Sequence, residues 1–137
     1  MQRLFLISSF VALAAVFLAG TVSAQESNPG ADLYAYYCAN CHGETATGDG
    51  PMAQFLTVRV PDLTRLSQRN GGVFPMLYVV HRLDGTRADL LHHSPMPDFG
   101  AQFYEENRGY GDELTAQLDL NGRILTITLY LEGLQKP

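Results

Sequence analysis

The chain is 137 residues long, which is enough for one domain. Its formal net charge of −5 and the absence of a basic tract argue against nucleic acid as a partner. An acidic surface instead favours partners that present a basic docking patch. The only two cysteines, Cys38 and Cys41, lie too close together in the sequence to join distant parts of a fold.

Residues 1–24 have the pattern of a secretory signal peptide. Arg3 precedes an apolar run over residues 4–20, and small residues lead to a cleavage point after Ala24. The run is also close to the minimum length for spanning a bilayer, so retention as a membrane anchor is the alternative. We therefore expect an exported protein in the periplasm, either released or anchored, with residues 25–137 as its single domain.

The first predicted helix covers residues 29–37 and leads into the motif Cys38-Ala39-Asn40-Cys41-His42. This C-x-x-C-H spacing is the attachment signature of a c-type haem. The two thiols can add to the two vinyl groups of one haem, and the adjacent histidine can offer a ring nitrogen to the iron. A zinc or iron–sulfur site would have to borrow ligands from elsewhere. A redox C-x-x-C fits less well, because no βαβ pattern surrounds the motif.

Glycines mark the chain on both sides of the motif. Gly30, Tyr34 and Cys38 are spaced by four and share one helix face, where the missing side chain of Gly30 would let another helix approach closely. Residues 43–51 hold three glycines in nine positions. Such a run is either a surface loop or a backbone that wraps close to a ligand edge, and its place directly after the motif favours the second.

Three further segments are predicted downstream. Residues 61–64 indicate a turn or helix start, and residues 102–113 are polar and indicate a loop. A second substantial helix is expected over residues 73–83, with Pro75 in its first turn. Its side chains at helical spacing form one stripe: Phe74, Leu77, Tyr78 and His81.

The last predicted helix covers residues 123–132 within the segment 114–133. Its apolar face consists of Ile124, Ile127, Tyr130 and Leu131. Its isoleucine and threonine content is unfavourable for a helix, so this expectation depends on the periodic pattern. No sheet and no internal repeat is predicted.

Met96 is the expected second ligand of the iron. It lies between Pro95 and Pro97 in a stiff loop, which reduces the entropy lost when sulfur is held against iron. His92 and His93 are the main alternatives. The other candidates are Met52, which lies too near the motif, Met76, which is expected in the core, and His81.

Ligation by histidine and methionine fills both axial positions of the iron. A filled iron has no open position for oxygen or peroxide, so we expect electron transfer and no enzyme active site.

Taken together, these residues resemble the class I c-type cytochromes over most of residues 29–134. The resemblance is carried by Gly30, Tyr34, Cys38, Cys41, His42, Met96, Pro97, Ile127 and Tyr130. Residues 48–51, 62–64 and 70–75 look like the bacterial exported branch of that family. The family usually has Phe where Tyr34 stands.

The resemblance implies an all-α cytochrome c fold around one covalently bound haem c, with the first and last helices crossing near Gly30 and Tyr130. It implies thioethers at Cys38 and Cys41, and iron ligation by His42 and Met96.

Two further residue roles follow from the resemblance. It places Pro51 on the side of the haem where His42 binds, with a backbone carbonyl that accepts from the imidazole. Some family members set a tryptophan against a haem propionate, and this chain has none. Arg65, Arg69 or a tyrosine is expected in that role.

The function implied is that of a one-electron carrier that docks transiently with larger redox proteins in the periplasm or its membrane. Contact with the membrane is expected only through such partners or through an uncleaved N-terminal segment. One alternative is a fixed cytochrome subunit of a periplasmic dehydrogenase or oxidase, with residues 102–119 as its interface. Another is a haem-based sensor or peroxidase with a displaceable distal ligand.

Overall fold

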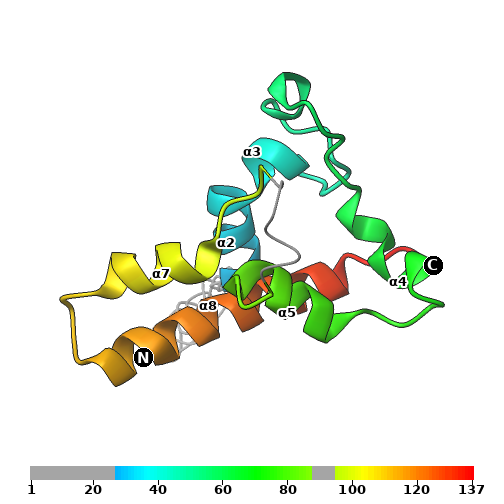
Figure 1. The fold of residues 1–137 in the computed structure, drawn as a ribbon. Helices are drawn as coiled ribbons and strands as arrows, with labels where there is room; N and C mark the ends of the chain where they lie inside the picture. The colour runs from blue at the N-terminus through cyan, green and yellow to red at the C-terminus, as the bar shows by residue number, and fades with distance from the viewer. Residues whose placement is uncertain (1–26, 88–94) are drawn as a thin grey trace, which may run out of the picture.

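The computed structural model describes residues 27–87 and 95–137, and every regular element in these ranges is a helix (Figure 1). The predicted all-α class is therefore confirmed. The predicted leader, His92 and His93 lie outside the described residues. In chain order the elements are α2 (Pro29–Tyr37), α3 (Ala39–His42), η2 (Ala53–Phe55), η3 (Leu63–Arg65), α4 (Leu66–Arg69), α5 (Met76–Asp84), α7 (Phe99–Asn107) and α8 (Glu113–Gly133).

Helix α8 is the central element, and α2, α5 and α7 all pack against it (Figure 1). It begins at the cap Asp112, whose carboxylate accepts from the backbone N–H and the hydroxyl of Thr115. It is longer than predicted at its N-terminal end. Its buried face consists of Ala116, Leu120, Ile124, Ile127, Thr128 and Leu131, so three of the four predicted apolar positions are fully buried, and Tyr130 lies at the edge.

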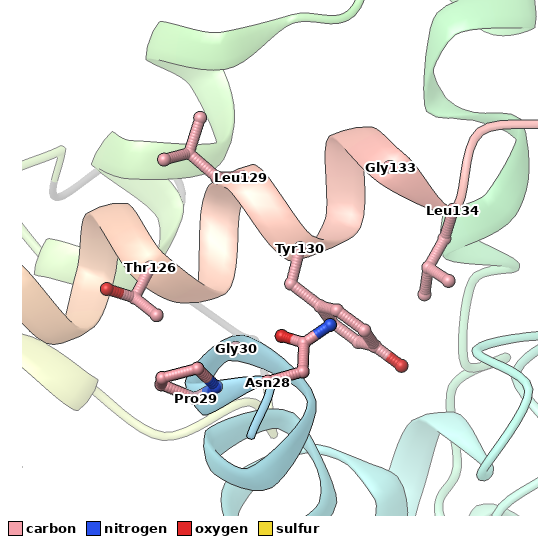
Figure 2. Close-up of a pocket in the computed structure, with 8 residues that line it drawn as sticks. All are labelled: Asn28, Pro29, Gly30, Thr126, Leu129, Tyr130, Gly133 and Leu134. Carbon is pink, nitrogen blue, oxygen red and sulfur yellow. The ribbon is translucent and has the colours of Figure 1, made fainter. Parts of the chain in front are cut away.

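Helices α2 and α8 cross at Gly30, as the sequence predicted. A Cβ atom on Gly30 would lie 2.7 Å from Cβ of Tyr130 and 2.9 Å from the carbonyl oxygen of Thr126. Figure 2 shows Gly30 facing these two residues across the crossing. The rings of Tyr34 and Tyr130 then pack with centroids 5.5 Å apart. The crossing fixes the direction in which α2 carries the chain toward α3.

The stripe predicted for residues 74–81 is only partly buried. Phe74 packs against the core, but Leu77 is 71% exposed and Tyr78 is 50% exposed, whereas Val79 and Leu83 are buried. Pro75 precedes the helix as its cap instead of lying in the first turn. Helix α5 therefore packs on α8 through the side that carries Val79 and Leu83.

Helix α7 was missed in the sequence, where residues 102–113 were expected to form a loop. Asp98 caps this helix by accepting from the backbone N–H of Ala101. Phe99 and Phe103, one turn apart, are both buried against the core. Within the segment 102–113 only Phe103 and Tyr104 of α7 are aromatic and polar residues follow them, so the apolar signal of α7 is short. A loop follows only from Arg108 onward.

Polar side chains also tie the three helices together. Tyr37 on α2 donates to Glu106 on α7 at 2.7 Å, and Arg123 on α8 donates to the same carboxylate at 2.8 Å. Arg123 further pairs with Asp119 at 2.7 Å. Partial burial disfavours the Glu106 carboxylate, but hydrogen bonds from Tyr37, Gln102 and Arg123 outweigh it and hold the pKa of Glu106 below its ordinary value.

No helix in the described part of the chain is long and apolar enough to span a membrane.

We predict that Gly30→Ala destabilises the holoprotein by about 1–3 kcal/mol, because the added methyl group overpacks the helix crossing. The measurement is denaturant unfolding followed by far-ultraviolet circular dichroism. The matched control is Gly122→Ala on α8, where a Cβ atom would meet no heavy atom within 4 Å. That control should gain up to about 1 kcal/mol from helix propensity. Equal effects of the two substitutions would contradict the account of the crossing.

Candidate functional site

The C-x-x-C-H motif forms a helical turn of its own at the end of α2. Cys38 caps α2 and starts α3, which ends at His42. Both cysteines are free thiols; Cys38 is buried and Cys41 is partly exposed. Burial, with a contribution from Cys41, raises the pKa of the Cys38 thiol to about 12. A protonated, buried thiol is poorly suited to thiolate ligation or disulfide exchange, but it is available for a thioether bond.

The ring of His42 is buried, at 8% exposure, and its orientation is fixed by a backbone carbonyl. Nδ1 lies 3.3 Å from the carbonyl oxygen of Pro61. Because a carbonyl only accepts, Nδ1 carries the proton of the neutral ring and Nε2 keeps its lone pair. Burial lowers the pKa of His42; the bond to Pro61 opposes this and the charge of Arg82 adds to it. The neutral imidazole with a free Nε2 is the form that binds a metal.

The proline that accepts from His42 is Pro61, and the prediction of Pro51 was wrong. The carbonyl of Pro51 accepts from the side chain of Gln54 at 3.0 Å instead. The reason is the course of the intervening loop, which turns back at Gly48 and passes next to Val60. A Cβ atom on Gly48 would lie 2.5 Å from the carbonyl oxygen of Val60. This approach brings the following residue, Pro61, beside the histidine.

The glycine-rich loop packs against α3 itself. The backbone N–H groups of Gly48, Gly50 and Met52 donate to the carbonyl groups of His42, Cys41 and Asn40 at 2.8, 3.2 and 2.9 Å. These are carbonyls that the end of a helix leaves without partners.

Gly43 and Gly50 are required by position, as Gly48 is. A side chain at Gly50 would meet the carbonyls of Ala39 and Asn40 at 2.6 and 2.5 Å. Gly43, at φ +82°, adopts a left-handed backbone and faces Asp49. The three glycines therefore allow close contacts with the backbone of the motif, with Asp49 in the same loop and with the backbone at Val60.

Tyr34 connects the helix crossing to the motif. Its hydroxyl donates to the carbonyl oxygen of Gly43 at 2.7 Å inside the core. Burial raises the pKa of Tyr34 well above its ordinary value, so the hydroxyl remains a donor. A phenylalanine at this position would fill the same space without donating to Gly43, whose carbonyl would keep only the backbone N–H of Ala46 as a donor. The tyrosine thus holds the turn that directly follows His42.

Met96 packs, partly buried, against the hydrophobic core that also contains Cys38 and Ala46. It lies outside any helix, between the exposed residues Pro95 and Pro97. The other candidate ligands on the described chain have different surroundings. Met52 is 39% exposed, Met76 is the first residue of α5, and Nδ1 of His81 lies 3.0 Å from the hydroxyl of Thr86.

The predicted partners of a haem propionate are engaged elsewhere. Nε of Arg65 lies 3.5 Å from the carboxylate of Asp62, and Arg69 donates to the carbonyl oxygen of the same residue. Arg82 on α5, which sequence reasoning did not single out, is partly buried and its charge acts on His42. The only sequence signal for this role was the place of Arg82 in the last turn of the predicted helix 73–83.

The residues around the motif fit a covalently attached haem. Two free thiols and a neutral imidazole with a free Nε2 are the donors that the motif offers, and Met96 packs against the same core as Cys38. Partly buried apolar side chains from separate segments pack beside the core and could line an apolar macrocycle. They are Leu63, Leu66, Phe74, Val80 and Met96. In the described ranges no group of three or more His, Cys, Asp or Glu residues could hold a metal ion.

Comparison with protein families gives a match to cytochrome c over residues 27–117, which is more than half of the chain. The chain therefore belongs to the cytochrome c family, and the predicted class of haem-binding electron carrier is confirmed. Neither the comparison with curated proteins nor the comparison with solved structures gave a match.

We predict that Tyr34→Phe destabilises the holoprotein by about 1 kcal/mol, because the buried carbonyl of Gly43 loses one of its two donors and keeps only the backbone N–H of Ala46. Denaturant unfolding measures the effect. Tyr36→Phe is the matched control, since Tyr36 is 79% exposed and the change should stay within about 0.5 kcal/mol. If the two variants were equally stable, the hydrogen bond to Gly43 would contribute nothing to the fold.

Proposed function

We propose that the protein is a one-electron carrier with a single haem c. In this proposal Cys38 and Cys41 hold the haem through thioethers, and His42 and Met96 ligate the iron. The observation that supports it most directly is the bond from Nδ1 of His42 to the carbonyl of Pro61, which orients Nε2 as a ligand. When bound, the haem supplies an iron that cycles between the ferrous and ferric states and so carries one electron.

The side chains of the site perform separate tasks. The hydrogen bond from His42 to Pro61 raises the basicity of the imidazole and fixes its tautomer. The two prolines beside Met96 hold the sulfur in a restricted loop, which lowers the entropy cost of ligation. With His42 and Met96 both as ligands, the iron would keep no position free for oxygen or peroxide, and the site would favour electron transfer over turnover of a bound substrate.

Arg82 is proposed to position a haem propionate. Arg82 is a partly buried residue of α5, and its charge acts on His42. A cation beside a propionate would offset the negative charge close to the haem. The ferrous state would then be favoured more than in a site where this charge is not offset.

The electron donor and acceptor are proposed to be larger redox proteins that dock transiently. The net charge of −5 suits partners with a basic docking surface. The pattern of residues 1–24 supports export to the periplasm, with the same segment as an anchor if it is retained. Residues 102–119, the interface expected for a fixed subunit, cover the end of α7, a loop and the start of α8, and most of their side chains are exposed.

We expect Met96→Ala to abolish the weak far-red absorption band that sulfur ligation gives to ferric haem, and to lower the reduction potential. The matched control is Met76→Ala, which removes a methionine from α5 and should leave both properties unchanged. Optical spectra and redox titration of the purified holoproteins measure these effects.

Two results would contradict the proposal. Retention of the far-red band in Met96→Ala would assign the distal ligand to another residue. Rapid carbon monoxide binding to the reduced wild-type protein at neutral pH would instead favour a sensor or peroxidase with a displaceable ligand.

A further inference from the structure

Helix α8 carries an exposed apolar stripe that the cytochrome site does not use. Leu114, Leu118, Leu125 and Leu129, here called the leucine stripe, are 65%, 62%, 49% and 50% exposed. At about 100° per residue they fall within a sector of about 60° around the helix axis. Single exposed leucines are ordinary, but four aligned on one helix, two on each side of the exposed Asn121, form an apolar surface of the kind used for association.

The leucine stripe faces away from the core of the protein. The buried side chains of α8, among them Leu120 and Ile127, point to the other side, where α2, α5 and α7 pack. Leu129 lines the pocket of Figure 2 together with Gly30 and Tyr130, and half of its surface remains exposed. The helices of the described ranges therefore leave the stripe open.

The spacing of the stripe is the same in both directions along the helix. The four leucines are separated by four, seven and four positions. If a second copy of α8 lies antiparallel with its axis of symmetry between residues 121 and 122, Leu114 faces Leu129 and Leu118 faces Leu125 of that copy. A two-fold interface requires such a self-complementary patch, in which each contact occurs twice. A different protein or a lipid surface would not require it.

The residue beside this symmetry axis supports the same arrangement. Gly122 lies in the middle of α8, where glycine costs about 0.5–1 kcal/mol relative to alanine. A Cβ atom at Gly122 would meet no heavy atom within 4 Å, so packing inside the described chain does not require a glycine there. A glycine at the centre of a helix pair would let the two backbones approach closely.

We propose that the leucine stripe is the interface of a homodimer in which two α8 helices pair antiparallel. The contact is about 22 Å long, from the rise of 1.5 Å per residue, and is small for a protein interface. We therefore expect a weak dimer that depends on concentration. Figure 1 shows α3 at the end of α2 remote from α8, so each haem motif would remain accessible to redox partners.

Salt dependence separates this contact from docking to a redox partner. Each copy carries a net charge of −5, so the two copies repel each other. Salt screens this repulsion and should strengthen an apolar self-association. Docking to a basic partner should instead weaken as salt rises.

The experiment is sedimentation velocity of the haem-loaded protein, as exported by its host, from low micromolar to near-millimolar concentration. We expect a monomer–dimer equilibrium that salt strengthens. Leu118→Lys and Leu125→Lys should each weaken dimerisation at least about tenfold, because a lysine would be buried against a leucine. Gln117→Lys is the matched control, since it adds the same charge to an exposed position of α8 outside the stripe. Circular dichroism and the haem spectrum check that each variant folds.

The register is tested by two double variants. L118K/L125K places like charges opposite each other and should abolish the dimer. In L118E/L125K, the glutamate of one copy faces the lysine of the other only if the helices pair in the proposed antiparallel register. This variant should therefore dimerise at least about tenfold more tightly than L118K/L125K. A monomer at all concentrations, association insensitive to Leu118 and Leu125, or a complex with a different protein through α8 would overturn the proposal.

Discussion

The hydrogen bond from the ring of His42 to the carbonyl of Pro61 is the contact on which the remainder of the site depends. The motif supplies the ring, but the acceptor comes from a residue nineteen positions later, so the bond forms only if the glycine-rich loop turns back. That turn requires Gly48 and Gly50 to approach backbone carbonyls closely. The loop in return satisfies the carbonyls at the end of α3. The motif, the glycine-rich loop and the carbonyl of Pro61 therefore form one unit. Together they keep the imidazole of His42 neutral, with Nε2 free.

This unit is held in place by the helix core. Helix α8 provides the buried surface, and α2 crosses it where Gly30 leaves room for Tyr130. From that crossing, Tyr34 extends to the carbonyl of Gly43, the residue that follows His42. The hydrogen bond of this buried tyrosine therefore links the helix crossing to the turn that follows the motif. The same α8 presents the leucine stripe on its opposite face, so one helix both organises the site and offers a surface for association.

Local signals in the sequence predicted the fold class, the helix over residues 29–37 and the role of Gly30. Contacts that depend on the three-dimensional path of the chain could not be predicted from such local signals. Two prolines, Pro51 and Pro61, follow the motif, and only the path of the loop decides which carbonyl meets the histidine. Helix α7 was hidden because its apolar signal is short, with Phe99, Phe103 and Tyr104 as its large apolar side chains. For α5, periodicity indicates that a stripe exists, but not which side of the helix a neighbouring helix covers.

The central claim is that the histidine of the motif binds the iron through Nε2 while Nδ1 donates to Pro61. Nitrogen NMR of the reduced holoprotein, labelled at histidine nitrogens, tests this directly. The account predicts one ring that is coordinated through Nε2 and carries on Nδ1 a proton that exchanges slowly with solvent. A ring coordinated through Nδ1, or one whose Nδ1 proton exchanges as fast as that of an exposed histidine, would contradict it.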